Sequence, residues 1–206
     1  MAPEVTGPMG IGRPGRPAVK EVSCKSILHA TASDYSLNPY VGCQHACVYC
    51  FARFMNRFTG HREPWGTYVD VKANAAEVLA GQLRRVERRR VFVSRVSDGW
   101  QPLEERYRLT RRCLALLVEG GFPLVVLSKS ALLARDLDIL AGSDVRLGVT
   151  LTTASERLRE RLEPFSSSIG ERLGCWSGPP PRVSAPSSCW DRCCPSFPTR
   201  RRNWSG

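Results

Sequence analysis

The sequence predicts an α/β fold, a partial (β/α) barrel of about four strand–helix units. Short apolar, β-branched segments alternate along the chain with segments whose apolar residues recur every three or four positions. This alternation is typical of parallel strands joined by right-handed crossover helices. Polar clusters follow the expected strands, as they do in barrels whose chemistry lies at the carboxyl ends of the strands.

The first half of the pattern begins before residue 40. Residues 38–41 predict a short first strand that runs into a cysteine-rich loop. Residues 74–90 predict an amphipathic helix with Asn74 as its N-cap, because the apolar residues follow helical spacing. The β-branched and aromatic segment 91–94 predicts the second strand, and residues 109–119 predict the next helix.

The second half repeats the same order. Residues 124–127 predict the third strand, and a helix over residues 132–140 follows, with Gly142 as its C-cap. Residues 145–150 predict the fourth strand. Residues 154–162 begin the fourth helix.

Both ends of the chain depart from this pattern. Residues 1–23 predict a disordered leader, residues 24–173 the core, and residues 174–206 an irregular, disordered tail rich in Pro, Ser and Cys. We hypothesise that a reading-frame shift near Gly174 replaced the true C-terminal half. A competing interpretation is a second metal site in the tail, but two of its cysteines are adjacent and poorly placed to share one cluster. Its ligands would be Cys175, Cys189, Cys193 and Cys194.

Three cysteines in a C-x3-C-x2-C run, Cys43, Cys47 and Cys50, are the most informative motif. Three thiolates this close in sequence fit a cubic iron–sulfur cluster, whose fourth iron must then take a ligand from outside the protein. The alternative is a zinc-stabilised nucleic-acid-binding module without catalysis. Its fourth ligand would be Cys24, His45 or His61. We favour the cluster, because zinc-binding cysteine pairs are usually C-x2-C and come in twos.

Polar residues that follow the other expected strands can converge on one bound cofactor. Lys129 suits a carboxylate, Asp98 suits an ammonium group, and threonine hydroxyls suit a ribose or a carboxylate. The candidates in chain order are Asp98 and Gln101, then Ser128 and Lys129, then Thr150, Thr152 and Thr153.

Composition sets outer limits on partners and compartment. The 206-residue chain has a formal net charge of +11, which favours an acidic partner such as nucleic acid. We interpret the arginines of residues 84–90 as a solvated helix face rather than a nucleic-acid patch. Nine cysteines without an export signal indicate a reducing, cytoplasmic compartment. No segment approaches the roughly 18 apolar residues of a membrane span, so we expect no membrane partner.

Six segments occur in the order seen in radical S-adenosylmethionine (SAM) proteins, and the chain resembles the spore photoproduct lyase-like branch of that superfamily. The resemblance covers roughly residues 24–173 and stops where the tail begins. The segments are residues 38–53, 97–104, 109–111, 128–130, 135–136 and 162–164.

The resemblance implies ligands and cofactors. The three cysteines of the motif would ligate a [4Fe–4S] cluster, and Tyr49 would back the SAM adenine through its main chain. Asp98 and Gln101 resemble the SAM-binding motif that follows the second strand in this superfamily. Lys129 would contact the SAM carboxylate.

The resemblance also implies an activity, that of a lyase-like radical SAM enzyme. Such enzymes cleave SAM reductively to a 5′-deoxyadenosyl radical, which takes a hydrogen atom from the substrate. The expected electron donor is a flavodoxin or ferredoxin. DNA, the substrate of spore photoproduct lyase, or another acidic molecule is the expected substrate. A barrel without its last strands would leave an unpaired edge and lack part of the substrate site.

Overall fold

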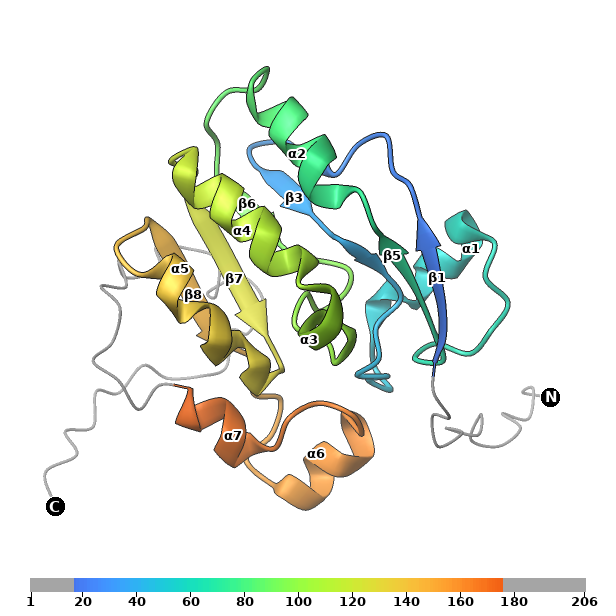
Figure 1. Cartoon of the computed structure of the whole chain (residues 1–206). Helices are drawn as coiled ribbons and strands as arrows, with labels where there is room; N and C mark the ends of the chain where they lie inside the picture. The colour runs from blue at the N-terminus through green and yellow to red at the C-terminus, as the bar shows by residue number, and fades with distance from the viewer. Residues whose placement is uncertain (1–16, 176–206) are drawn as a thin grey trace, which may run out of the picture.

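Four parallel strands with helices on one face form the centre of the fold. The structure is a computed structural model that describes residues 17–175. β3 (Tyr35–Leu37), β6 (Val91–Val93), β7 (Leu124–Ser128) and β8 (Val145–Val149) lie in this order in a five-stranded sheet. Helices α2 (Ala75–Leu83), α4 (Leu109–Glu119) and α5 (Leu137–Leu140) cover one face of the sheet (Figure 1). The predicted α/β fold, a partial barrel, is confirmed.

Further elements surround this centre. β2 (Leu28–Ala30) pairs antiparallel with β3, while β1 (Ala18–Val22), β5 (Tyr68–Lys72) and β4 (Tyr40–Val41) form a second sheet in that order. The 3-10 helix Phe51–Met55 leads into α1 (Asn56–Thr59), and α3 (Leu103–Tyr107) follows β6. The 3-10 helix Ala131–Asp136 precedes α5, and α6 (Glu156–Leu162) and α7 (Ile169–Gly174) follow β8.

Alternating side chains give the parallel strands two different faces. Val91 and Leu124 are buried in the main hydrophobic core, which α2, α4 and α5 complete on the helix side. Phe92, Val125 and Leu127 point to the opposite face and line a cavity. Because neighbouring residues of a strand point to opposite faces, burial of the first set directs the second set into the cavity.

The first predicted strand is interrupted rather than continuous. The sequence predicts one strand over residues 38–41, but β3 ends at Leu37 and β4 begins at Tyr40. Asn38 and Pro39 connect β3 of the five-stranded sheet to β4 of the second sheet. Proline has no N–H to donate to a ladder, and the Asn38 Oδ1 atom accepts a hydrogen bond from Val96 N at 3.1 Å.

The predicted leader extends too far into the chain. Its last residues, 18–22, form β1, which pairs in parallel with β5. β5 was not predicted either, although Tyr68–Lys72 alternates buried and partly exposed residues over its second half. Residues 1–16 of the leader and 176–206 of the tail lie outside the described residues. The frame-shift hypothesis and most of the proposed second metal site therefore stay predictions.

Two predicted helices differ from the structure. The helix predicted over residues 74–90 ends at Leu83, because the chain turns back at once, with Arg85 N donating to Gln82 O at 2.9 Å. Asn74 makes no capping bond with its side chain; its amide instead bonds both backbone groups of Cys24. The helix predicted over residues 132–140 is a 3-10 helix followed by the single turn α5.

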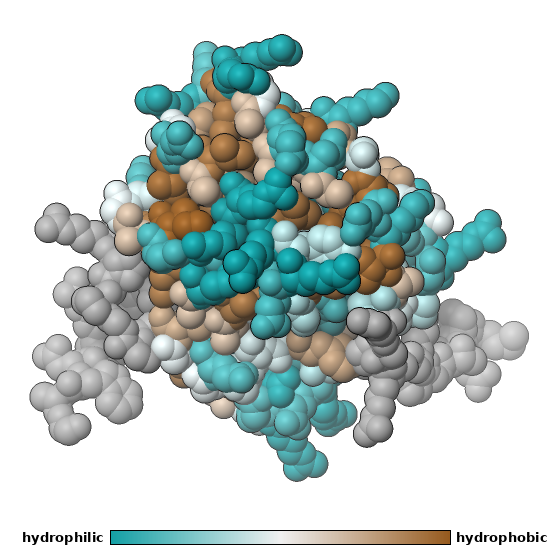
Figure 2. Space-filling model, viewed as in Figure 1, coloured by the Kyte–Doolittle hydropathy of each residue, from teal (hydrophilic) through white to brown (hydrophobic). Residues whose placement is uncertain are grey.

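The outer surface on the helix side carries a polar band with hydrophobic residues around it. Figure 2 shows hydrophilic residues across the middle of this face, over α3 and α4. No helix among the described residues is long and apolar enough to cross a membrane.

A histidine beside β5 makes the stability of this region depend on pH. His61 Nε2 lies 2.9 Å from Asp70 Oδ2, its Nδ1 lies 3.0 Å from Glu63 Oε2, and its ring stacks on Tyr68. Burial alone would lower the pKa of His61, but the bonds to both carboxylates outweigh it and raise the pKa. The resulting stabilisation is fully present below the ordinary histidine pKa of about 6.5 and is lost as pH rises through the raised value.

We therefore expect the urea midpoint of unfolding to fall between pH 6 and pH 9 by more in the unsubstituted chain than in a His61→Gln variant. Glutamine keeps hydrogen-bonding capacity but cannot carry the charge, so it serves as the matched reference. Equal falls in the two proteins would show that the His61 charge does not stabilise the fold.

Candidate functional site

The cysteine loop is a tight turn held between β4 and the 3-10 helix that precedes α1. Ala46 N donates to Cys43 O at 3.2 Å and Cys50 N donates to Cys47 O at 3.1 Å, so the chain turns twice within eight residues. Gly42 begins the loop with a φ of 87°, and a Cβ there would lie 2.4 Å from the Tyr68 carbonyl oxygen. Only glycine fits this position without displacing backbone.

Two glutamines fix the loop to the segment that follows β6. Gln101 is fully buried; its Oε1 accepts from Gln44 N at 2.9 Å and its Nε2 donates to Gly42 O at 3.4 Å. The Gln44 side chain returns the contact by accepting from Leu103 N at 2.7 Å. Both polar ends of Gln101 are thus used on the cysteine loop, and Gln101 does not line the cavity.

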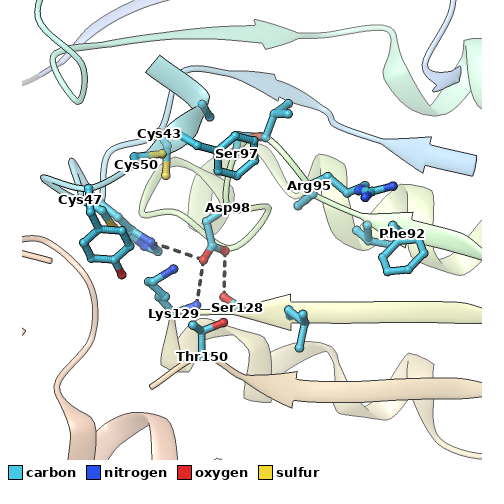
Figure 3. Close-up of a pocket in the computed structure, with 18 of the residues that line it drawn as sticks. Cys43, Cys47, Cys50, Phe92, Arg95, Ser97, Asp98, Ser128, Lys129 and Thr150 are labelled. Carbon is cyan, nitrogen blue, oxygen red and sulfur yellow. Dashed lines mark hydrogen bonds and ion pairs between the residues drawn. The ribbon is translucent and has the colours of Figure 1, made fainter. Parts of the chain in front are cut away.

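The three thiols line one end of a cavity of about 560 Å³. Figure 3 shows Cys43, Cys47 and Cys50 at this end, with Arg95 and Phe92 at the other. The carboxyl ends of β6, β7 and β8 form the floor between them. Of the predicted site residues, eight line this cavity: Cys43, Cys47, Tyr49, Cys50, Asp98, Ser128, Lys129 and Thr150.

The donor set of the loop, three thiols, is of the kind that holds iron–sulfur clusters. Among residues 17–175, no three or more His, Cys, Asp or Glu side chains are grouped so that they could hold one metal ion, and the zinc alternative gains no support there. A cluster several atoms across does not require its thiolates to meet at one point. Burial raises the pKa of Cys43 well above its usual range and that of Cys47 to about 11, so metal binding would have to displace thiol protons.

Asp98 joins the ends of β6 and β7. Its Oδ1 accepts from Ser128 Oγ at 2.8 Å and from Trp100 N at 2.9 Å, and its Oδ2 accepts from Lys129 N at 2.8 Å. His45 Nδ1, on the cysteine loop, lies 3.4 Å from the same Oδ2 atom. These partners fill both oxygens, so the structure uses Asp98 to position its neighbours.

The charge of Asp98 is stabilised despite its burial. Desolvation alone would raise the pKa of Asp98, but the nearby His45 and the backbone N–H groups of Lys129 and Trp100 outweigh it and hold the pKa well below the usual range. A carboxylate in this position fixes the cysteine loop, the end of β6 and the end of β7 relative to one another. In the sequence, His45 stands out only as a possible zinc ligand.

Lys129 presents its ammonium group to the cavity at the end of β7. Its Nζ lies 5.8 Å from the centre of the Tyr49 ring, a cation–π contact. Among the described residues no carboxylate pairs with this ammonium. Lys129 is therefore placed beside the cysteine loop with its charge available to a ligand.

Tyr49 connects the cysteine loop to the segment after β8 through Glu163. Its hydroxyl donates to the Glu163 carboxylate and lies 2.8 Å from Thr152 Oγ1. Glu163 Oε2 pairs with Arg172 at 2.7 Å, and neither side chain is more than 1 % exposed. Val48 N also donates to Leu162 O at 2.9 Å.

Thr152 belongs to this anchor and does not line the cavity. The sequence places Glu163 in a family segment without indicating a role for it, and no motif singles out Arg172. Their burial follows from tertiary packing and leaves no periodic signal in the sequence.

Comparison with known proteins gives a consistent picture. The family model described as "Radical SAM superfamily" matches residues 37–174. A protein of Methanocaldococcus jannaschii, described as uncharacterized, is 34% identical over 140 residues, which are 68% of this chain and 52% of that protein. An uncharacterized protein of Mycobacterium tuberculosis is 36% identical over 167 residues, covering 74% of this chain and 49% of that one. The chain thus spans about half the length of these relatives.

Solved structures share the fold. Spore photoproduct lyase complexed with dinucleoside spore photoproduct has a TM-score of 0.60 at 16% identity, covering 76% of this chain and 46% of the lyase. A variant of that lyase with bound AdoMet and the same dinucleoside has a TM-score of 0.59, also at 16% identity, covering 76% and 45%. At this identity the likeness establishes the fold alone.

Proposed function

Because the chain belongs to the radical SAM superfamily, we propose that it holds a [4Fe–4S] cluster and SAM and cleaves SAM reductively. The observation that carries this proposal is the placement of three loop thiols at one end of a cavity that Lys129 also lines. Among the described residues, no carboxylate pairs with the Lys129 ammonium group. When bound, the cluster and SAM would supply an electron and a 5′-deoxyadenosyl radical. The lyase-like, hydrogen-abstracting character of the reaction is part of the same proposal.

The protein's own residues would bind and orient these groups. Cys43, Cys47 and Cys50 would hold the cluster. Lys129 would receive the SAM carboxylate, since its ammonium lies beside the cysteine loop without a carboxylate partner among the described residues. Tyr49 and Thr150, which line the same cavity, would contact the rest of SAM.

Three residues that hold the cysteine loop in place, Gln101, Asp98 and Glu163, would keep this arrangement rigid. Gln101 and Asp98 hold the cysteine loop against the end of β6, and Glu163 holds Tyr49 through its hydroxyl. A preorganised loop keeps the thiols in place without reorganisation at the moment of reaction. Asp98 would contribute to SAM binding by positioning the Lys129 backbone.

We propose an acidic substrate, with DNA as the first candidate. The formal net charge of +11 supports this choice, since a basic protein concentrates polyanions near its surface. The lyase that shares the fold is complexed with a dinucleoside photoproduct, which gives the candidate a second line of support. A flavodoxin or ferredoxin would deliver the electron.

The proposal is tested by SAM cleavage. We expect the chain, reconstituted anaerobically with iron and sulfide and reduced with dithionite, to release 5′-deoxyadenosine and methionine in equal amounts. Chromatography of the quenched mixture measures both. A reconstituted, fully reduced chain that releases no 5′-deoxyadenosine above a reductant-free control would refute the proposed activity.

A further inference from the structure

Arg95 occupies the end of the cavity away from the cysteines. It follows β6, lines the cavity and is exposed, and its guanidinium lies 4.8 Å from the centre of the Phe92 ring. In the view of Figure 3, the two side chains lie together, beyond Asp98 and far from the cysteine thiols. No carboxylate among residues 17–175 pairs with Arg95.

The backbone on either side of Arg95 is fixed. Ser94 N donates to Leu37 O at 2.7 Å, and Val96 N donates to Asn38 Oδ1 at 3.1 Å. Two bonds to the junction of β3 and β4 thus hold the arginine between them.

Ser94 adopts a conformation that serine rarely takes. Its φ is 66°, in the left-handed region, and its buried hydroxyl has no hydrogen-bond partner among the described residues. Gly99 lies directly against it, since a Cβ there would be 2.3 Å from Ser94 Oγ. Strain of this kind gathers at ligand sites. Arg95 is the next residue in the chain, and its guanidinium lies over the Phe92 ring.

The cavity has an excess of positive charge. Its lining includes Lys129 and Arg95 but, among the described residues, one carboxylate, that of Asp98. Both oxygens of Asp98 already accept hydrogen bonds. The two cations therefore remain available to an anionic ligand in a cavity whose exposed lining is otherwise largely apolar.

We infer that Arg95 binds an oxyanion of the substrate, in a subsite separate from that of SAM. This inference rests on the proposed function. SAM must reach the cysteine end, where Lys129 is available for its carboxylate, whereas Arg95 lies at the opposite end. Phe92 supports one face of the guanidinium and leaves its edge of N–H donors free for paired bonds to phosphate or carboxylate oxygens.

The test compares anionic probes on the reconstituted chain by calorimetric titration. The probes are thymidylyl-thymidine, its uncharged methylphosphonate analogue, and glutarate. We expect Arg95→Gln to weaken binding of an anionic probe by about tenfold or more, since a charge-assisted bond is lost, and to leave the uncharged analogue unaffected. Arg95→Lys should fall between the two, because it keeps the charge but not the fork.

Arg57→Gln is the matched control, because Arg57 is exposed on α1, lies outside the cavity and carries the same charge. It should bind every probe as the unsubstituted chain does. Dependence on Arg95 with thymidylyl-thymidine identifies a phosphate subsite, and dependence with glutarate identifies a carboxylate subsite.

Three results overturn the inference: no anionic probe binds Arg95→Gln more weakly, Arg57→Gln has an equal effect, or Arg95→Gln weakens SAM instead. SAM cleavage by the unsubstituted chain is measured separately. A failure of the proposed activity therefore remains distinguishable from a failure of this subsite.

Discussion

Replacing Cys47 by alanine is expected to abolish the cluster. Cys47 is the middle thiol of the loop. Among the described cysteines, only Cys43, Cys47 and Cys50 line the cavity, so no other is placed to replace it. Two thiolates do not retain a cluster whose remaining iron already depends on an external ligand. We expect the anaerobically reconstituted variant to lose nearly all of the broad absorbance near ~400 nm that marks such clusters, together with its bound iron.

Cys24→Ser provides the matched control. Cys24 is a partly buried thiol outside the cavity. In the zinc alternative it is one of three candidates for the fourth ligand. The cluster account predicts full absorbance and iron content in this variant. Full absorbance in Cys47→Ala, or its loss in Cys24→Ser, would show that the ligands are assigned wrongly.

The second large effect is expected at the buried ion pair behind Tyr49. Arg172→Met leaves the Glu163 carboxylate buried without its cation, and breaking such a pair typically costs about 3–5 kcal/mol of folding stability. Arg172 also donates to the carbonyl oxygens of Thr150 and Ser167, each at 2.8 Å, so several acceptors lose a partner together. We expect a large fall in the urea midpoint and looser retention of the cluster.

Arg112→Met removes a comparable charge from an exposed pair. Arg112 pairs with Glu77 on the surface between α4 and α2, where water already screens both charges. Its midpoint should change little. If the urea midpoint of Arg172→Met falls no further than that of Arg112→Met, the pair with Glu163 does not anchor the segment after β8.

The regular part of the fold was predictable because it follows from periodicity. β6, β7, β8 and α4 were found within one or two residues, since their buried side chains repeat at strand or helix spacing. β1 and β5 do not stand out in the sequence, because β1 is largely exposed and β5 alternates buried and partly exposed residues only over its second half. Their pairing in parallel joins residues about 50 positions apart, and local patterns do not report such contacts.

The candidate site was predictable in composition but not in roles. The cysteine spacing located one end of the cavity, and the rule that chemistry follows parallel strands located its floor. The resemblance implies that Gln101 contacts SAM, yet its side-chain amide is hydrogen-bonded to the backbone of Gln44 and Gly42. Arg95 is not predictable as a site residue, because a single arginine after a strand forms no motif. Its role depends on its contact with the Phe92 ring, which only the folded chain shows.

Other residues of the family segments have structural roles that only packing reveals. Glu104 is fully buried, accepts from Thr110 N and Arg111 N at the start of α4, and pairs with Arg135 at 3.1 Å. Arg135 also pairs with the buried Asp136 at 2.7 Å. These side chains tie α3, α4 and the 3-10 helix Ala131–Asp136 together.

The central claim is that three thiols leave one iron of a [4Fe–4S] cluster open for SAM. Mössbauer spectroscopy of the chain reconstituted with ⁵⁷Fe, with and without SAM, tests it most directly, because each iron reports its own ligands. The account predicts four irons per cluster, of which one changes its signal when SAM is added. A chain that assembles no cluster, or a spectrum in which SAM alters none of the irons, would contradict it.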